Sequence, residues 1–246
     1  MLILGGSSEA AALARRIAGE PEIEATLSLA GATASPAPAP IPLRIGGFGG
    51  AVGLAAYLQS ERIDAAVDAT HPFASRMSMN AVAACRQAGV ALVVFTRPPW
   101  PREPRDLWTE VGTVEEAADA LGERPRTAFL TQGRRQLAAF ARAPQHRYVV
   151  RAIDPPAEIE LVPNCKLILA RGPFMLANEL KLMQRERIDA LIAKNSGGSA
   201  TYAKIEAARM LGIEVVMLRR PPAQEAETLD DLDAVIAWIA SHRPPP

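Results

Sequence analysis

The chain has 246 residues, enough for one large domain or two small ones, and its 27 basic and 27 acidic residues leave no net charge. A balanced charge excludes the long-range attraction on which nucleic-acid binders and polybasic membrane-surface proteins depend. Hydrophobic residues make up 49% of the chain, which is enough to bury a core, and the apolar runs are too short to span a bilayer. We therefore expect a cytoplasmic globular protein that binds neither nucleic acid nor membranes.

Short apolar runs alternate with amphipathic stretches through the first hundred residues. Strands are predicted at residues 1–4, 24–30, 63–69 and 90–96, and helices at 10–18, from the glycines at 46–50 to about 59, and at 75–88. Residues 31–42 are rich in alanine and proline and are expected to form a loop, because proline cannot donate to a strand ladder. Strands that alternate with helices indicate parallel βαβ units.

The same alternation restarts after residues 97–109, which carry four prolines and two tryptophans and are expected to form an ordered linker. Strands are predicted at residues 127–130, 147–152, 166–170, 188–193 and 213–218. Helices are predicted at residues 114–121, 135–141, 174–185, 200–210 and 229–241, followed by a frayed proline tail.

An internal repeat organises the chain into two halves. Residues 59–65 recur almost unchanged at 184–190, and Gly89 and residues 97–99 have counterparts at Gly212 and 220–222. The predicted fold is α/β, with two similar doubly wound, Rossmann-like parallel-sheet halves flanking a cleft. The predicted domains are residues 1–99, a linker and first helix at 100–124, and residues 125–246, whose last helix at 229–241 could pack back on the first domain.

The two cysteines, Cys85 and Cys165, are isolated from each other and from the histidines. This pattern argues against a disulfide scaffold or a structural zinc site, and we expect no metal centre.

The turn after the first strand is rich in glycine and hydroxyl groups. Its residues are Gly5, Gly6, Ser7, Ser8 and Glu9. Glycines allow a tight turn and the close approach of a phosphate, and the following helix offers free N–H groups. The alternative is a plain turn in which a serine caps the helix.

The end of the second predicted strand lacks an acidic residue. Sites for NAD usually carry a carboxylate there to hold the ribose hydroxyls, but residues 28–33 contain none. If a nucleotide binds, this absence favours NADP over NAD.

Two further polar segments follow strands in the middle of each half. Residues 68–74 include Thr70 and His71, and the alternative to a role in binding is that these two cap the next helix. Residues 194–199 combine an ammonium, an amide, hydroxyls and glycine N–H groups, which suits a phosphate or carboxylate, the alternative being a flexible polar loop. No Walker A motif or Ser/His/Asp series stands out, which weakens phosphoryl-transfer and hydrolase interpretations.

Taken in order, these motifs resemble the precorrin-6A reductase family of corrin-ring biosynthesis. The matching segments are residues 3–10, 46–50, 68–74, 130–133, 194–198 and 203–209. One departure is Ser7, where the family pattern has threonine, and it keeps the hydroxyl. The resemblance implies the NADPH-dependent reduction of one double bond of the precorrin-6A macrocycle to give precorrin-6B, without flavin or metal.

The resemblance and the motifs together give a set of candidate site residues. The candidates for NADPH binding are Gly5, Gly6, Ser7, Ser8, Glu9, Gly47, Phe48 and Gly49. The candidates for binding the tetrapyrrole substrate are Thr70, His71, Phe73, Ala74, Thr131, Gly133, Lys194, Asn195, Ser196, Gly197, Gly198 and Arg220. His71 is the candidate catalytic residue, as a proton donor or as a substrate contact.

The choice of basic residues is uneven, with 23 arginines against 4 lysines. An arginine-rich site would suit the many carboxylates of a tetrapyrrole, although codon bias explains the same numbers. Two other functions remain open at this point: a different NADP-dependent reductase on the same fold, and a two-lobed protein that binds an anionic small molecule without catalysis. We expect a monomer or a weak homo-oligomer, and the sequence does not decide whether the substrate carries cobalt.

Overall fold

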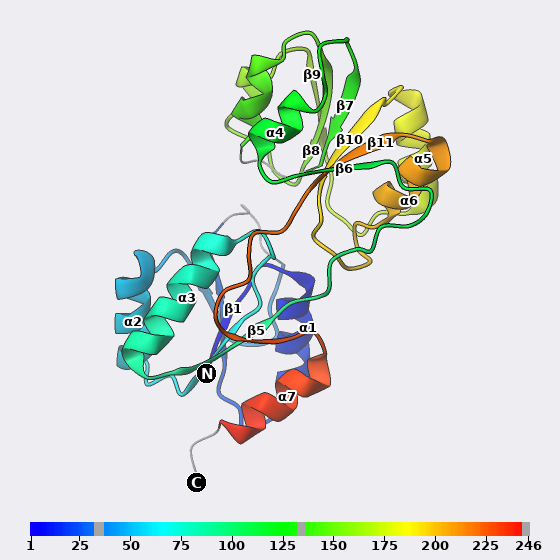
Figure 1. Cartoon of the computed structure of the whole chain (residues 1–246). Helices are drawn as coiled ribbons and strands as arrows, with labels where there is room; N and C mark the ends of the chain where they lie inside the picture. Colours follow the sequence, from blue (N-terminus) through cyan, green and yellow to red (C-terminus); the bar gives the residue numbers. More distant parts are fainter. Residues whose placement is uncertain (32–36, 132–135, 243–246) are drawn as a thin grey trace. The chain divides into compact units, whose positions relative to one another are not determined.

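The computed structural model describes residues 1–31, 37–131 and 136–242, which fall into two compact units. The first unit joins Met1–Pro98 to Pro221–Pro246, and the second is Pro99–Arg220 (Figure 1).

The first unit is built on a six-stranded parallel sheet with the order β12-β5-β4-β1-β2-β3. Its strands are β1 (Leu2–Leu4), β2 (Thr26–Leu29), β3 (Leu43–Ile45), β4 (Ala65–Asp68), β5 (Ala91–Phe95) and β12 (Glu227–Leu229). Its helices are α1 (Ser8–Ile17), α2 (Gly50–Ser60), α3 (Ser75–Ala88) and α7 (Leu232–Ser241).

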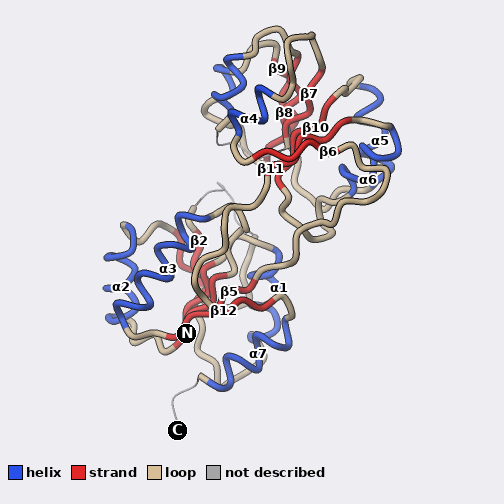
Figure 2. Tube along the Cα trace, in the orientation of Figure 1, coloured by secondary structure: helices blue, strands red, loops and turns tan. Residues whose placement is uncertain are grey.

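Helices cover both faces of this sheet, which explains why its central strands are almost wholly apolar (Figure 2). Leu2 and Leu4 of β1 pack with buried residues of α2 and α3, whereas Ile3 packs with those of α1 and α7. The alternation of side chains along one short strand therefore feeds two separate hydrophobic layers.

The second unit repeats this plan with the strand order β6-β11-β10-β7-β8-β9. Its strands are β6 (Trp108–Val111), β7 (Thr127–Leu130), β8 (Arg147–Ala152), β9 (Cys165–Leu169), β10 (Ala190–Lys194) and β11 (Glu214–Leu218). Its helices are α4 (Val114–Asp119), α5 (Leu176–Arg185) and α6 (Ala203–Leu211), with the 3₁₀ turns η1 (Leu137–Arg142) and η2 (Ile159–Leu161). Phe129 and Val149 pack toward α5 and α6, and the ring of Tyr148 meets that of Phe140 of η1 on the opposite face.

The structure confirms the prediction of two similar doubly wound α/β halves. The first five strands of each half have the same order, and the repeated sequence forms the same turn in both. Arg62 and Arg187 take the rare left-handed conformation, with φ of 51° and 52°, in the turns that lead from α2 to β4 and from α5 to β10. Gly89 and Gly212 end α3 and α6 with φ of 69° and 64°.

The sixth strand of each sheet pairs out of sequence order. β6 follows β5 in sequence but pairs with β11, and β12 follows β11 but pairs with β5. The predicted domains require a correction for this reason. Residues 221–246 group with the first unit rather than with residues 125–220, and residues 99–124 belong to the second unit and include the strand β6.

The prediction overlooked three strands, β3, β6 and β12, all of which lie at sheet edges. Edge strands are short and partly exposed, so they lack the apolar run that marks a central strand. The helix predicted at residues 135–141 is the 3₁₀ turn η1, and the predicted proline tail lies outside the described residues.

Ile239 of α7 tests whether the C-terminal helix belongs to the core of the first unit. Its side chain is 3% exposed and packs with buried residues of α1, β1 and β5. We expect Ile239→Ala to lower the free energy of unfolding by about 2–4 kcal/mol, because it leaves a cavity. Hydrogen exchange should quicken in β1 and β5 but not in β7 and β10.

The control is Met210→Ala, at a side chain that is 63% exposed on α6, which should change stability little. Faster exchange in β7 and β10 after Ile239→Ala would contradict the assignment of α7 to the first unit.

Candidate functional site

The order of strands in each sheet locates the candidate site residues. Strand order reverses between β1 and β4 in the first unit and between β7 and β10 in the second. Loops that follow the two strands at such a reversal leave toward opposite faces, and open α/β sheets bind ligands in the space that this creates. The segments after β1, β4, β7 and β10 are those in which the sequence analysis placed most of the site.

The two glycines after β1 are required for different reasons. A Cβ on Gly5 would lie 2.6 Å from Cδ1 of Leu27, so this glycine lets the turn pack against β2. Gly6 has open space around it but a φ of +121°, which side-chain-bearing residues rarely adopt. Only Gly6 therefore presents an exposed stretch of backbone that a ligand could approach.

Ser7 connects the two loops at the reversal point. Its Oγ accepts a hydrogen bond from Ala10 N at 3.1 Å, which caps α1, and donates one to the carbonyl of Ala69 at 2.7 Å. The capping alternative is therefore correct for the Ser7 side chain. Ser8 donates to Glu9, and Glu9 forms an ion pair with Arg97. The carboxylate of Glu9 is thus neutralised within the unit.

The segment after β4 is organised by Asp68, which the sequence analysis did not include among the site residues. Asp68 is 1% exposed, and its Oδ1 accepts hydrogen bonds from Thr70 N at 3.0 Å and Thr70 Oγ1 at 2.7 Å. Its Oδ2 meets no hydrogen-bond donor among the described residues. Burial, and to a lesser extent the charge of Asp68, raises the pKa of Cys85 to about 11, so this thiol stays protonated.

His71 is held in a defined orientation by its own loop. Its Nδ1 accepts a hydrogen bond from Phe73 N at 3.2 Å, which places the proton of the neutral ring on Nε2. Ala74, which follows Phe73 directly, is the N-cap of α3, with no side-chain cap. The residues from Thr70 to Ala74 therefore form one ordered turn at the carboxyl end of β4.

The glycine-rich loop after β3 is held by Arg44. The guanidinium donates from Nη1 to the carbonyl of Gly46 at 2.7 Å and from Nη2 to that of Gly47 at 3.0 Å. It lies over the ring of Phe48, 3.8 Å from the centroid. The sequence analysis missed Arg44, although its place two residues before the glycine-rich run at 46–50 was a usable signal.

The segment after β10 is also tied down by its neighbours. Asn195 uses Oδ1 and Nδ2 to bind the backbone N and O of Trp100, at 2.7 and 3.1 Å, so its amide has a structural role. Arg220 donates to the carbonyls of Asn195 and Ser196, both at 2.9 Å. Gly197 and Gly198 both have positive φ, and the Trp100 indole donates to the carbonyl of Gly198. The predicted loop is therefore ordered, not flexible.

The two candidate residues after β7 are Thr131 and Gly133. Thr131 follows β7 and donates from Oγ1 to the carbonyl of Ile192 at 3.0 Å. Gly133 lies outside the described residues.

Charged side chains are buried beneath the carboxyl edge of the second sheet. Arg151 forms an ion pair with Glu179, and both are almost fully buried. Lys204 is 4% exposed, and its ammonium lies 5.6 Å from the centroid of the Trp100 ring. Burial lowers the pKa of Lys204 to about 7, with the positive charges of Arg151 and Lys194 adding to the effect and Glu179 opposing it.

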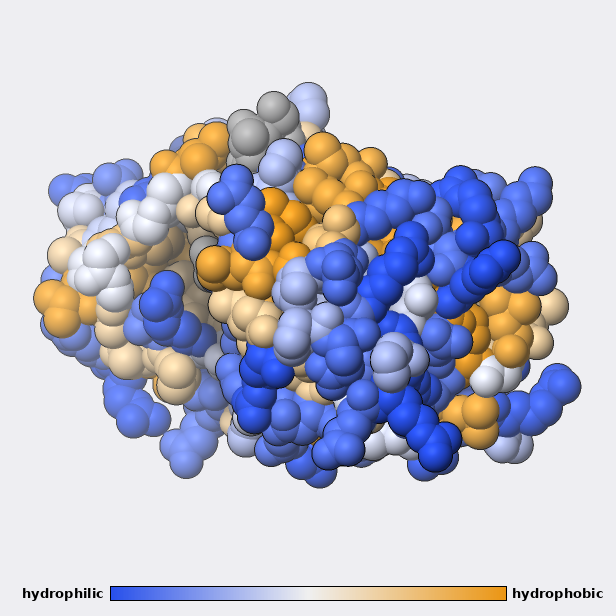
Figure 3. Space-filling model, turned by 90° about the horizontal axis from the view of Figure 1, so that it is seen from above, coloured by the Kyte–Doolittle hydropathy of each residue, from blue (hydrophilic) through white to orange (hydrophobic). Residues whose placement is uncertain are grey.

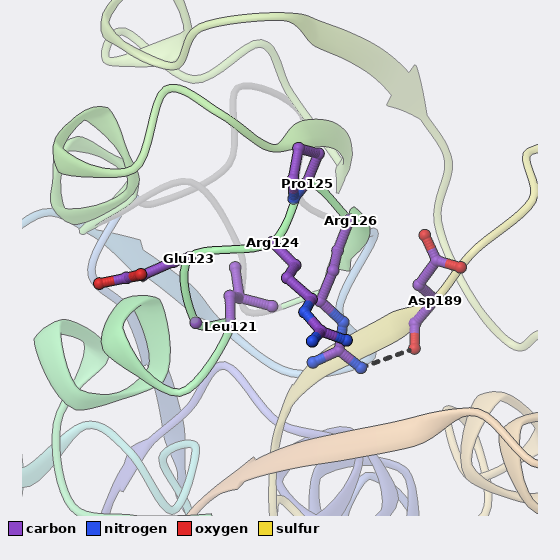
Figure 4. Close-up of a pocket in the computed structure, with 7 residues that line it drawn as sticks. Leu121, Glu123, Arg124, Pro125, Arg126 and Asp189 are labelled. Carbon is purple, nitrogen blue, oxygen red and sulfur yellow. Dashed lines mark hydrogen bonds between the residues drawn. The ribbon is translucent and has the colours of Figure 1, made fainter.

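A pocket of about 610 Å³ lies at the opposite edge of this sheet (Figure 4). It is lined by Leu121–Arg126 and Asp189, which precede β7 and β10, and Arg126 donates to the carbonyl of Asp189 and pairs with Glu214. None of the predicted site residues lines it, so we do not assign it to the site.

The surface, the possible metal ligands and the helix lengths bear on other kinds of site. Hydrophilic residues cover most of the face shown in Figure 3, with hydrophobic residues gathered in separate patches. Within the described ranges, no three His, Cys, Asp or Glu residues cluster in a way that could hold a metal ion. The helices of the described part of the chain are too short or too polar to cross a membrane.

Fold and site together define an α/β protein of two parallel-sheet units, each with an ordered polar loop cluster at its strand-order reversal. The profile of the family described as precorrin-6x reductase CbiJ/CobK matches residues 1–240. The chain belongs to this family.

Individual relatives agree along nearly the whole chain. The precorrin-6A reductase of a Sinorhizobium species is 49% identical over 98% of this chain and 92% of its own length. That of Rhodococcus erythropolis is 47% identical over 98% of this chain and 97% of its own length. A solved structure titled CobK precorrin-6A reductase is 43% identical, with a TM-score of 0.94 over 100% of this chain and 97% of that one.

Lys204 generates a prediction about stability and pH. The neutral form predominates in the folded protein above about pH 7, whereas an unfolded lysine stays protonated up to about 10.5. Unfolding then takes up a proton, so we expect this group to raise the free energy of unfolding by up to about 1.4 kcal/mol per pH unit above pH 7. Lys204→Met should flatten the rise measured by urea unfolding between pH 7 and 9.

The control is Lys181→Met at an exposed lysine of α5, which should leave the pH profile unchanged. Identical profiles for the wild type and Lys204→Met would show that Lys204 is charged in the folded state.

Proposed function

We propose that this chain catalyses the NADPH-dependent reduction of one double bond of precorrin-6A, giving precorrin-6B, in cobalamin biosynthesis. The observation that carries the proposal is the similarity over nearly the full length to proteins named precorrin-6A reductase, at 49% and 47% identity. The ordered loops at the strand-order reversals supply a compatible site in this chain.

The relatives also favour a substrate without cobalt. Proteins named precorrin-6A reductase are 43–49% identical to this chain, whereas those named cobalt-precorrin-6A reductase are 26–28% identical. The difference supports the metal-free macrocycle as the substrate.

The first unit has the features that a dinucleotide needs. The exposed backbone at Gly6 and the amino end of α1 provide N–H groups for a pyrophosphate, and the Glu9–Arg97 pair removes a repelling charge. Gly47, Phe48 and Gly49 lie at the end of β3, on the side of the sheet where the adenosine half would bind. When bound, NADPH would supply the hydride.

The second unit offers groups that suit the substrate carboxylates. Lys194 ends β10, and Ser196 and the glycines that follow it form an ordered loop of donors clamped by Arg220. We assign Lys194 and Ser196 to carboxylate binding and Asn195 to holding the loop. Thr131 and Gly133 remain proposed contacts of the same substrate.

The turn from Thr70 to Ala74 is assigned to the macrocycle at the reversal point of the first sheet. The reduction adds a hydride and a proton across a double bond, and the proton has to come from a side chain or from water. The bond from Phe73 N fixes the orientation of the His71 ring, and we assign His71 to a contact with the substrate rather than to proton donation.

The function is tested by following NADPH absorbance with purified protein and precorrin-6A. We expect oxidation of one NADPH per macrocycle and a product two hydrogen atoms heavier by mass spectrometry, with slower turnover with NADH. Oxidation with other unsaturated substrates but not with precorrin-6A would indicate a different reductase. Tight binding of the macrocycle without turnover would indicate a binding protein.

His71→Ala separates the two roles open to the imidazole. A substrate contact predicts a KM raised by about tenfold and a kcat within a few-fold of the wild type, because the lost interaction is made before the transition state. The control His242→Ala, at the end of α7, should leave both constants unchanged. A kcat lowered by about 10²–10⁴, together with the loss of an ionisation from the pH–rate profile, would assign the proton donor to His71 instead.

Lys194→Ala tests the assignment of the substrate carboxylates to the second unit. Loss of one charge-assisted contact should raise the KM for the macrocycle by about ten- to a hundredfold and leave the Kd for NADPH unchanged. Lys181→Ala, at an exposed lysine of α5, is the matched control. A weaker affinity for NADPH instead would mean that the two ligands are assigned to the wrong units.

A further inference from the structure

Arg44 lies where dinucleotide-binding folds distinguish NADP from NAD. It is directly opposite Ser28 in the register of β3 and β2, and its Nη1 is 3.4 Å from the Ser28 hydroxyl. In such folds a carboxylate at the end of the second strand binds the ribose 2′-hydroxyl of NAD, and a nearby arginine accommodates the 2′-phosphate of NADP. Residues 28–31 at the end of β2 contain no carboxylate, so Arg44 is the charge beside this position.

The guanidinium of Arg44 is held in place by neutral groups. It donates to the backbone carbonyls of Gly46 and Gly47, and its Cζ lies 3.8 Å from the centroid of the Phe48 ring and 5.1 Å from that of the Tyr57 ring. Carbonyls and rings fix the orientation of the cation without cancelling its charge. Within the described residues, no carboxylate forms an ion pair with Arg44.

Arg97 differs from Arg44 in the partner of its charge. It also follows a strand of the first sheet, but its charge is paired with Glu9. Arg44 is half-buried, and its hydrogen bonds with the described residues use Nη1 and Nη2, so its Nε–H has no acceptor among those residues. A preorganised, partly desolvated guanidinium with donors to spare suits a phosphate.

We propose that Arg44 is the residue that selects NADPH over NADH by binding its 2′-phosphate. The proposal rests on the proposed function, since it concerns the cofactor of that reaction. The bonds to Gly46 and Gly47 set the position of the guanidinium before the nucleotide arrives, so little conformational entropy is lost on binding. The structural alternative is that Arg44 only holds the glycine-rich loop.

The test compares ligands that differ only in the 2′-phosphate. Calorimetry on the full chain measures Kd for 2′,5′-ADP against 5′-AMP, and for NADP⁺ against NAD⁺, with the wild type, Arg44→Gln and Arg44→Lys. We expect Arg44→Gln to weaken 2′,5′-ADP and NADP⁺ by about ten- to a hundredfold while 5′-AMP and NAD⁺ change less than about twofold. Arg44→Lys keeps the charge without the fork and should recover part of the preference.

The matched control is Arg86→Gln. Arg86 is an exposed residue in the last turn of α3, at the amino-terminal edge of the sheet, where its partner Glu225 is 3.8 Å away. It should leave all four affinities unchanged. Retained binding of NAD⁺ by Arg44→Gln, with an unchanged melting temperature, shows that the variant is folded.

The other outcomes separate this inference from the proposed function. Equal weakening of both members of each pair, or an unchanged preference, would overturn the role of Arg44 and leave the reductase proposal intact. Failure of the wild type to bind any of the four nucleotides would overturn the proposed use of NADPH itself, and the assignment of Arg44 with it.

Discussion

The constraint on which the site depends is the reversal of strand order in a parallel sheet. Crossovers between parallel strands return along one face of the sheet. Only where the crossovers change face do the loops after two neighbouring strands leave toward opposite faces and open a space between them. This happens between β1 and β4 and between β7 and β10. The Oγ of Ser7, which caps α1 and donates to Ala69 beyond β4, joins two such loops across the reversal. Polar residues lie at the ends of these strands because the diverging loops leave a space for a ligand at the carboxyl edge of each sheet.

The sixth strands pair out of sequence order, and this interleaves the two units along the chain. β12 and α7 complete the first unit after the chain has built the second, and β6 opens the second directly after β5. The connections around Arg97 and Arg220 are the two crossings, and they are also equivalent positions of the internal repeat. The first sheet therefore includes chain from before and after the second unit, whereas all strands of the second sheet lie within Pro99–Arg220, so truncation at residue 99 or 220 would remove the edge strand β12 from the first sheet.

The central strands could be predicted from the sequence, whereas the edge strands and the long-range side-chain contacts that hold the loops could not. Strands such as β4 and β10 are buried on both faces, and a continuous apolar run is the direct result. β3 and β12 have one free edge and exposed residues, so their pairing depends on neighbours distant in sequence. Glycine turns could be predicted because the residues that form them are neighbours in the sequence. The partners of Glu9 and Asn195 are about 90 residues away in sequence, so these contacts left no pattern along the chain.

Two of the many arginines, Arg44 and Arg220, hold the loops that follow β3 and β10. Arg44 binds the carbonyls of Gly46 and Gly47, and Arg220 binds those of Asn195 and Ser196, so one planar fork holds two successive backbone groups in each unit. A lysine ammonium could not hold both carbonyls with the same fixed geometry. Loops with left-handed glycines would otherwise sample many conformations, and these hydrogen bonds restrict them. In the first unit no carboxylate of the described residues pairs with Arg44, so the neutral carbonyls that hold its guanidinium leave its positive charge in place. The same guanidinium can therefore order a loop and still attract an anion.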